Sequence, residues 1–336
     1  KRRSYIPLFS PLLLKEIPLI NEILKLEKQA QELEPTEGRR DEFLQAARDY
    51  ANTFLNSLDE KKVYNVDFED VKLLDEAGIS EEPADLSEII HLLDRAVDSP
   101  GLDPASPGHL GYIPGGGVYT SSIGDYLAAV FNKFAGLYSS SPGAVKLENQ
   151  LIRWTAELIG YPEEALGNVT SGGSIANLTA LATARDAKKI TPERISKSVI
   201  YITEQTHHCV HKAVRIAGLS HCIQRIVSMD DHFRMDSAEL EKCVVQDVAD
   251  GLIPFYVAAS CGSTDTGSVD SFEDIADICE THDIWFHIDA AYGGYFVLVD
   301  ELKPLFKGME RSDSVVVDPH KSLFLPYGIG IALIKD

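Results

Sequence analysis

The sequence predicts an α/β fold in which helices cover both faces of a mostly parallel β-sheet, preceded by an α-helical N-terminal region. Beyond Gly167, short runs of β-branched and aromatic residues alternate with helical stretches. Runs without polar alternation indicate strands that are buried on both faces, as parallel sheets require. Between about residues 10 and 98, apolar residues instead recur near helical spacing, and acidic turns separate the stretches.

The N-terminal region is predicted to hold three helices, over residues 11–34, 40–58 and 84–97. Residues 99–117 are rich in Pro and Gly, so a loop is expected there. Helices resume after this loop. In residues 143–160, apolar residues recur every three or four positions and Gly160 then provides a stop signal, which predicts an amphipathic helix.

The remaining chain is predicted to alternate strands with helices. The strands are expected over residues 198–203, 222–227, 255–259, 284–288, 314–317 and 329–334. The helices are expected over residues 174–188, 211–217, 237–248 and 272–282. This alternation is typical of a mostly parallel sheet with both faces covered. Ligands bind such sheets outside the carboxyl ends of the strands, so reactive side chains are expected where each strand ends.

Composition excludes several classes of protein. Because 44% of the residues are hydrophobic and 25% are charged, the chain can bury an ordinary core and is not disordered. The 31 Lys and Arg against 52 Asp and Glu leave a net charge of −21, which repels nucleic acids and anionic lipids, so neither is expected as a partner. No apolar run approaches the roughly 18 residues of a membrane span. Five scattered cysteines without a CxxC pair indicate reduced thiols and a cytoplasmic location.

Two charged side chains follow predicted strands. Asp289 ends the run 284–288 and precedes small residues, and a buried carboxylate must pair with a cation or with hydrogen-bond donors. Lys321 lies just beyond the run 314–317. A partly buried lysine has a lowered pKa and becomes the amine nucleophile that a Schiff base requires.

Two further groups complete a candidate site. Gly172, Gly173 and Ser174 open a predicted helix, where free backbone N–H groups and the helix dipole favour an anion. His207 and His208 supply flat imidazole rings after a predicted strand. Each feature alone also has an ordinary structural interpretation, as a cap, a turn or a surface charge. Together, an amine, an acid, a flat ring and an anion site meet the requirements of pyridoxal phosphate.

The same residues resemble a known family. Its motifs are similar to His287-Ile288-Asp289-Ala290-Ala291-Tyr292-Gly293-Gly294, Asp318-Pro319-His320-Lys321, Gly172-Gly173-Ser174 and Glu204-Gln205-Thr206-His207. The family is that of the group II pyridoxal-phosphate-dependent amino acid decarboxylases, which includes the aromatic amino acid and glutamate enzymes. The resemblance runs from about His109 to the last residue, in the right order and spacing. It implies fold type I, the aspartate aminotransferase-like fold, with a seven-stranded sheet in its large domain.

The resemblance implies roles for individual residues. Lys321 would form the Schiff base with the cofactor, Asp289 would pair with its pyridinium nitrogen, and His207 would stack on its ring. Further cofactor contacts are implied for Ala291, Gly173, Ser174, Thr264, His287 and His320. Tyr112 and Pro114 lie in a segment that matches a substrate pocket. Asp318 is left out of the phosphate site, because the aromatic enzymes commonly carry Asn there and a phosphate would repel a carboxylate.

The activity implied by the resemblance is decarboxylation of an L-amino acid to the corresponding amine and CO₂. An aromatic substrate is slightly favoured, because no positive charge to hold an acidic side chain is evident around Tyr112. An aminotransferase or a carbon–carbon lyase of the same fold is the alternative. A more distant one is a serine hydrolase using Ser174, Asp289 and His320, which would leave Lys321 without a role.

No metal is expected, because His207, His208 and His211 lack the acidic residue of a zinc-binding HExxH motif. Residues 1–115 are expected to form the helical region with a substrate-side loop, and residues 116–336 the cofactor-binding large domain. Only fifteen residues follow Lys321. The large domain is therefore expected to be truncated and the small C-terminal domain to be missing. The resemblance also implies a homodimer whose active site lies near the subunit interface.

Overall fold

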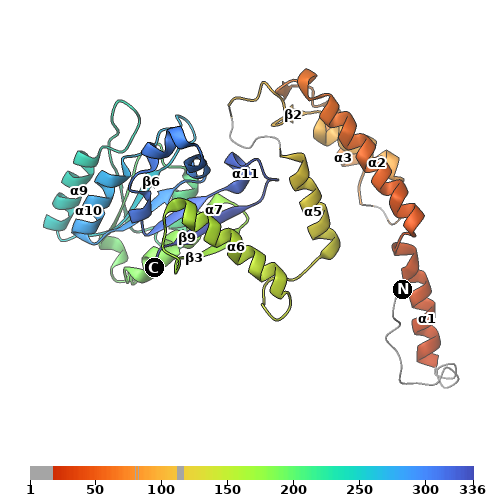
Figure 1. Ribbon diagram of the computed structural model, residues 1–336, viewed down its shortest axis with the longest axis horizontal. Coiled ribbons are helices and arrows are strands. Elements are labelled where there is room, and N and C mark those ends of the chain that lie inside the picture. Colours follow the sequence, from red (N-terminus) through yellow and green to blue (C-terminus); the bar gives the residue numbers. More distant parts are fainter. Residues whose placement is uncertain (1–17, 80, 82, 112–116) are drawn as a thin grey trace. The chain divides into compact units, whose positions relative to one another are not determined.

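A computed structural model describes residues 18–79, 81, 83–111 and 117–336. The chain divides into two compact units, Lys1–Gly108 and His109–Asp336 (Figure 1). This division falls within the Pro- and Gly-rich stretch in which a loop is predicted. Throughout the ranges described, no helix is both long enough and apolar enough to cross a membrane.

The first unit is mainly helical, as predicted. Its helices are α1 (Pro18–Ala30), α2 (Glu37–Asn56), α3 (Leu73–Glu76) and α4 (Leu86–Leu93). A short ladder joins β1 (Tyr64–Asn65) to β2 (Gly101–Leu102) in antiparallel register. The side chains of Thr36 and Asp85 cap α2 and α4 by accepting hydrogen bonds from first-turn N–H groups, which explains where these two helices begin.

A seven-stranded sheet organises the second unit. In spatial order its strands are β3 (Leu166–Thr170), β9 (Gly330–Ile334), β8 (Ser314–Val317), β7 (Trp285–Asp289), β6 (Ile253–Ser260), β4 (Ser198–Ile202) and β5 (Ile223–Ile226). Only β9 runs against its neighbours, so the prediction of a mostly parallel sheet is confirmed. The strand β3 was not among the six predicted runs, because Gly167 and Asn168 interrupt its apolar residues.

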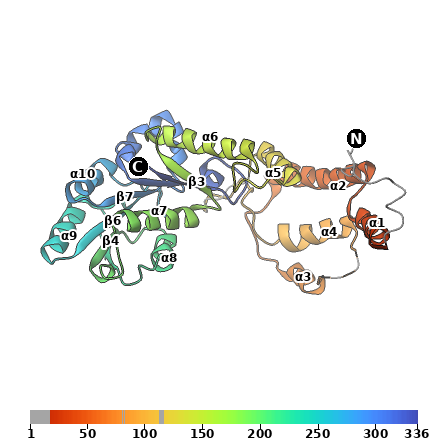
Figure 2. The same cartoon turned by 90° about the horizontal axis from the view of Figure 1, so that it is seen from below.

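Helices cover both faces of this sheet. One face carries α7 (Gly173–Ala187) and α8 (His208–Ile216), and the other carries α6 (Pro142–Ile159), α9 (Ser237–Ala249) and α10 (Phe272–His282). Figure 2 shows α7 and α8 on the side of the sheet opposite to α6. In the part of the chain that the structure describes, this unit also contains the α-helices α5 (Tyr119–Phe131) and α11 (Pro319–Ser322). In β4, Val199 and Tyr201 enter one core and Ile200 and Ile202 the other, which is why the strand shows no polar alternation.

The carboxyl ends of the parallel strands meet at one edge of the sheet. Asp289 is the last residue of β7, and Asp318 directly follows β8. Because β9 is antiparallel to both β3 and β8, β3 points the same way as β8 and delivers Gly172 to the same edge. Segments that are far apart in the sequence therefore bring their polar residues together there.

Candidate active site

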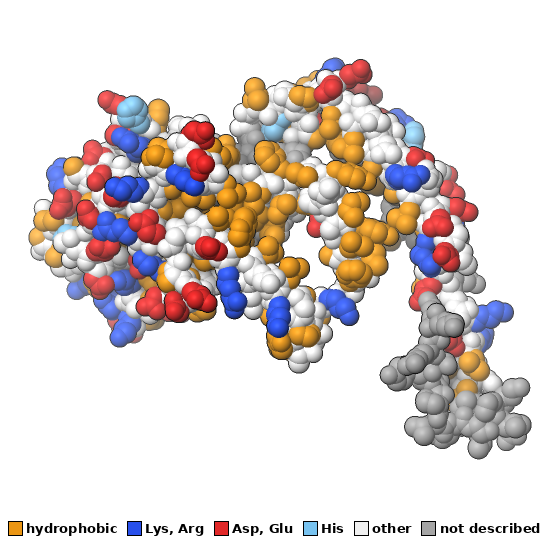
Figure 3. Space-filling model, in the orientation of Figure 1, with side chains coloured by type: hydrophobic (Ala, Val, Ile, Leu, Met, Phe, Trp, Pro, Cys, Tyr) orange, Lys and Arg blue, Asp and Glu red, His pale blue; other side chains and the backbone are white. Residues whose placement is uncertain are grey.

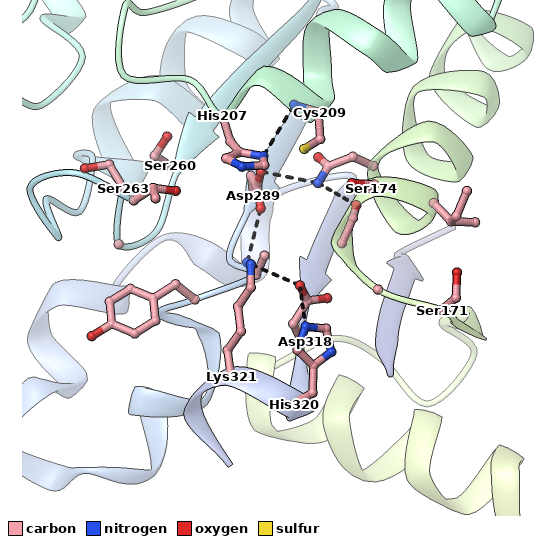
Figure 4. A pocket seen from close by; sticks show the side chains of 18 of the residues that line it. Ser171, Ser174, His207, Cys209, Ser260, Ser263, Asp289, Asp318, His320 and Lys321 are labelled. Atoms are coloured by element: carbon pink, nitrogen blue, oxygen red, sulfur yellow. Dashed lines mark hydrogen bonds and ion pairs between the residues drawn. The ribbon is translucent and has the colours of Figure 1, made fainter. Parts of the chain in front are cut away.

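A cavity of about 280 Å³ opens at this edge of the sheet (Figure 4). The structure brings eight of the predicted cofactor residues into its lining, namely Lys321, Asp289, His207, Ala291, Gly173, Ser174, Thr264 and His320. The ninth, His287, lies elsewhere. Tyr112 and Pro114, the predicted substrate contacts, lie outside the described residues.

Lys321 reaches the cavity from α11, and its Nζ lies 3.1 Å from Oδ2 of Asp318. The lysine side chain is 23% exposed, whereas that of Asp318 is 2% exposed. Burial raises the pKa of Asp318, and the charge of Lys321 acts in the opposite direction. The sequence predicts that Asp318 stays out of the phosphate site; in the structure Asp318, directly after β8, is part of the cavity lining.

Asp289 is held by hydrogen bonds on both carboxyl oxygens. Oδ1 accepts from the backbone N–H of Ala291 at 3.1 Å, and Oδ2 accepts from Nδ2 of Asn177 at 3.2 Å. Asn177 comes from α7 and also donates to the carbonyl oxygen of Gly173 at 2.9 Å. Figure 4 shows Asp289 near the middle of the site, between His207 and Lys321. Donors on both oxygens therefore hold the carboxyl group of Asp289 in one orientation.

His207 is the N-cap residue of α8. Its Nδ1 accepts a hydrogen bond from the backbone N–H of Cys209 at 3.3 Å, so the ring proton lies on Nε2. Burial lowers the pKa of His207, which keeps the ring neutral at pH 7. The ring of His208 is tilted against it, with centroids 4.1 Å apart. The cap therefore fixes both the position and the tautomer of the ring that faces the cavity.

His287 is fully buried behind Asp289. Its Nε2 lies 2.9 Å from Oδ1 of Asn177, and its Nδ1 lies 2.8 Å from Oγ of Ser314. Since Nδ2 of Asn177 donates to Asp289, Oδ1 must accept, and Nε2 of His287 carries the hydrogen. Burial lowers the pKa of His287 to about 4, so the ring is neutral. His287 therefore does not line the cavity, in contrast to the prediction that it contacts the cofactor, because both of its ring nitrogens are engaged by protein.

The start of α7 has the form of an anion-binding turn. Gly172 has a φ of +136°, a conformation that favours glycine. A Cβ added to Gly173 would come within 2.7 Å of Oδ2 of Asp318 and 3.3 Å of Cβ of Ala291, so no larger residue fits. The turn leads into a helix of 15 residues, whose first N–H groups and dipole favour a negative charge.

The structure also identifies residues that the sequence did not nominate. Asn177 and Gln205 line the cavity, and Oε1 of Gln205 is a buried acceptor without a hydrogen-bond partner. Cys209 lines it too, but burial raises the pKa of its thiol to about 12, so it is no nucleophile. The sequence contained one signal for Asn177, since it is the polar exception on a buried helix face otherwise made of glycine, alanine and leucine.

The serine hydrolase and metal alternatives do not match this geometry. Nδ1 of His320 contacts the backbone of Ile329, and its Nε2 lies 3.8 Å from Oδ2 of Asp318. His320 is thus not placed between Ser174 and Asp289 as a catalytic triad would require. Among the residues that the structure describes, no three His, Cys, Asp or Glu side chains gather as metal ligands.

The described residues fit pyridoxal phosphate. A glycine turn at a helix start provides for the phosphate, a lysine for the aldehyde, a carboxylate for the ring nitrogen and an imidazole for the ring face. Such a set, at the carboxyl edge of this sheet, defines a pyridoxal-phosphate enzyme of fold type I. Residues 69–336 match the family described as the pyridoxal-dependent decarboxylase conserved domain, and the chain belongs to this family. The predicted family and its cofactor are thereby confirmed.

Individual relatives are similar to this chain over part of their length. The aromatic-L-amino-acid decarboxylase of Bacillus atrophaeus is 36% identical over 259 residues, which cover 77% of this chain and 54% of that relative. Tryptophan decarboxylase 2 of Oryza sativa subsp. japonica is 31% identical over 241 residues, 69% of this chain and 48% of the relative. The chain therefore spans about half the length of these curated relatives.

Solved structures show the same fold. A structure of Oryza sativa TDC with PLP and tryptamine superposes with a TM-score of 0.83 at 25% identity, covering 90% of this chain and 65% of that one. Mouse CSAD superposes with a TM-score of 0.80 at 26% identity, covering 88% of this chain and 64% of that one. These similarities confirm the predicted fold type I architecture.

Proposed function

We propose that this chain forms the cofactor-binding part of an enzyme that decarboxylates an L-amino acid to the corresponding amine and CO₂. The observation that carries the proposal is the convergence of Lys321, Asp289 and His207 on one cavity beside the anion-binding turn. Bound pyridoxal phosphate supplies an electron sink for the pair left behind when the bond between Cα and the carboxylate breaks.

Each side chain of the site has a proposed role in this reaction. Lys321 presents the amine that carries the cofactor. Asp289, held by two donors, would pair with the protonated ring nitrogen and so keep the electron sink effective. His207 would cover one ring face and Ala291 the other, which would constrain the substrate carboxylate to the pose in which its bond breaks. Gly173 and Ser174 would hold the phosphate, and Thr264 would approach the ring or the substrate carboxylate.

We propose an aromatic L-amino acid as substrate. The curated relatives are named for aromatic amino acids and for tryptophan, and their similarity covers 77% and 69% of this chain. An aminotransferase or a carbon–carbon lyase of the same fold remains the alternative. A panel of amino acids with detection of products separates them: the proposal requires CO₂ and a primary amine from an aromatic substrate, whereas a keto acid would contradict it.

Attachment of the cofactor to Lys321 can be tested without turnover. Borohydride reduction of the purified protein should fix pyridoxal phosphate covalently on a peptide containing Lys321, detected by mass spectrometry. The variant Lys321→Ala should lose this label and its turnover. A parent protein that is colourless and gains no mass on reduction in the presence of pyridoxal phosphate would contradict the proposal.

We also propose a homodimer with the active site near the interface. The helix α6 buries Ile152 and Ala156 against the sheet but leaves Leu147, Leu151 and Trp154 exposed at 59%, 42% and 41%. Figure 3 shows hydrophobic side chains gathered over α5 and α6, and none of the residues of α5 is buried. An exposed apolar surface of this kind is typical of a protein interface.

Sedimentation tests the dimer. The variant Leu151→Asp should shift the protein toward the monomer, whereas Ile216→Asp, at an exposed apolar residue on α8, should not. A parent protein that sediments as a monomer would contradict the proposal. Since all five cysteines are free thiols in the structure, we further propose a cytoplasmic location, which imaging of a tagged chain in its host cell would test.

A further inference from the structure

Asp318 is enclosed in a way that leaves its carboxyl group incompletely satisfied. The residue is 1% exposed, and Oδ1 is buried without a hydrogen-bond partner. Oδ2 forms the ion pair with Nζ of Lys321 at 3.1 Å. A buried carboxylate with one oxygen lacking a donor is costly, and protonation reduces that cost because it neutralises the group in the wall of the cavity.

The carboxyl group of Asp318 also packs closely against the anion-binding turn. A Cβ added to Gly173, the first residue of α7, would come within 2.7 Å of Oδ2. A Cβ added to Gly330, the first residue of β9, would come within 2.5 Å of Oδ1. Asp318 therefore packs against both backbones and has no room to turn away. An anion bound at the start of α7 would meet this carboxyl group directly.

The groups facing Asp318 decide its protonation state. Lys321 and His320 come from α11, and Nε2 of His320 lies 3.8 Å from Oδ2. Asp289 of β7 acts in the opposite sense and favours a protonated Asp318. Cys209 and Tyr295 are neutral, because burial raises the pKa of each to about 12. Once Lys321 is no longer a cation, the main group that keeps Asp318 ionised is gone.

We propose that Asp318 holds Lys321 as an ion pair before the cofactor binds, accepts the proton that Lys321 gives up, and then donates that proton in a hydrogen bond to the cofactor phosphate. This inference rests on the proposed function, because it concerns the loading of the same site. It makes Asp318 a positioning residue whose charge changes with occupancy. It also explains how a carboxyl group can stand beside an anion-binding turn.

Attachment of the cofactor requires Lys321 to lose a proton. Lys321 attacks an aldehyde only as a neutral amine, so one N–H bond of its ammonium group breaks and its electrons stay on Nζ. The proton passes to Oδ2 of Asp318, 3.1 Å away. Attachment then releases one water, made from the aldehyde oxygen and the two remaining amine hydrogens. The protonated carboxyl group is now a donor, which a phosphate accepts and which a carboxylate could not be.

A comparison of pyridoxal phosphate with pyridoxal isolates the contribution of the phosphate group, which we propose contacts Asp318. Both molecules attach to Lys321 through the same aldehyde, so the ratio of their dissociation constants reports only on the phosphate. The ratio is measured by fluorescence titration of the full chain, freed of cofactor, between pH 7 and pH 9. The variants are Asp318→Asn and, as a control, Asp313→Asn. Asp313 is a half-buried carboxyl group that accepts from the N–H of Phe286 at 2.7 Å and does not line the cavity.

In the parent chain and in Asp313→Asn, the phosphate advantage should fall as the pH rises, because phosphate binding needs a proton on Asp318. One linked proton changes the ratio by up to about tenfold per pH unit. We expect a fall of at least about tenfold between pH 7 and pH 9. In Asp318→Asn the amide donates without titrating, so the ratio should stay constant within about twofold, since the phosphate itself is doubly ionised above about pH 7.

The possible outcomes separate the two proposals. An equal pH dependence of the ratio in the parent and in Asp318→Asn overturns the role of Asp318, and so does an equal weakening of both ligands at every pH. Failure of both ligands to attach to the parent chain would instead reject the proposed function. If Asp318→Asn does not fold by circular dichroism, Asp318→Ser, a smaller neutral donor, should give the same constant ratio.

Discussion

The two carboxyl groups of the cavity differ in how the fold stabilises them. Asp289 accepts hydrogen bonds on both oxygens, from the backbone of Ala291 and from Asn177. Asp318 has an ion pair with Lys321 on one oxygen and no hydrogen-bond partner on the other. The protein itself satisfies the first group, whereas the second depends on what occupies the cavity. Two aspartates at the carboxyl ends of neighbouring strands are thus suited to different roles. Asp289 is held in place by the protein, whereas Asp318 responds to what binds in the cavity.

The largest expected effect on turnover comes from neutralising the carboxylate of Asp289. Asp289→Asn should keep the fold, because Asn replaces the carboxylate at nearly equal volume, but it removes the charge that we propose pairs with the ring nitrogen. We expect turnover to fall by about 10³-fold, the scale of losing an electrostatic stabiliser at a reacting centre. Asp318→Asn should keep turnover of the loaded enzyme within about tenfold. Turnover of cofactor-saturated enzyme checks both variants, and equal losses would remove the distinction between the two groups.

The neutral ring of His287 contacts Asn177, which in turn donates to Asp289. The burial of this ring should lower the stability of the fold in acid. The pKa of His287 is lowered to about 4 from an ordinary 6.5. Below pH 6.5 the unfolded chain takes up a proton that the folded chain refuses, so stability falls as the pH drops toward 4. The loss amounts to about 3 kcal/mol.

Denaturant unfolding of the parent and of His287→Gln at pH 7 and pH 4.5 measures how much His287 contributes to this loss of stability. The free energy of unfolding of the parent should fall more steeply than that of the variant, because glutamine takes up no proton in the unfolded state. The exposed His211, replaced in His211→Gln, serves as the control and should follow the parent. An equal pH dependence for parent and His287→Gln would show that this ring is not buried as a neutral group.

The features that could be predicted from the sequence are those that depend on local pattern. The carboxyl ends of β7 and β8 are visible because an apolar run stops at a polar residue, and this located both Asp289 and Lys321. The start of α7 is visible because glycines precede a helical stretch. Since parallel strands share one edge, these separate local signals were sufficient to place most of the candidate site.

The features that could not be predicted depend on packing between distant segments. Asn177 meets His287, 110 residues further along the chain, only because α7 packs on the face of the sheet to which β7 presents that histidine. Asp318 was left out because the similar aromatic enzymes commonly carry Asn there and a phosphate repels a carboxylate. Its place in the cavity lining instead follows from the register of β8 with β7 and β9. The strand β3 is held in the sheet by pairing with β9, since its own residues lack a continuous apolar run.

Asn177 joins the two regions of the cavity, because the same Nδ2 donates to Asp289 and to the carbonyl oxygen of Gly173. Asn177→Ala should therefore remove one of the two donors that hold the carboxylate of Asp289, and leave Nε2 of His287 without its acceptor. Loss of a hydrogen-bond partner behind a reacting group typically costs about 10- to 100-fold in activity, and we expect turnover to fall by that amount. The control Thr179→Ala removes an exposed hydroxyl from the same helix and should leave turnover unchanged. Steady-state kinetics at saturating cofactor makes the comparison. Full activity in Asn177→Ala would show that the backbone of Ala291 alone is enough to hold Asp289.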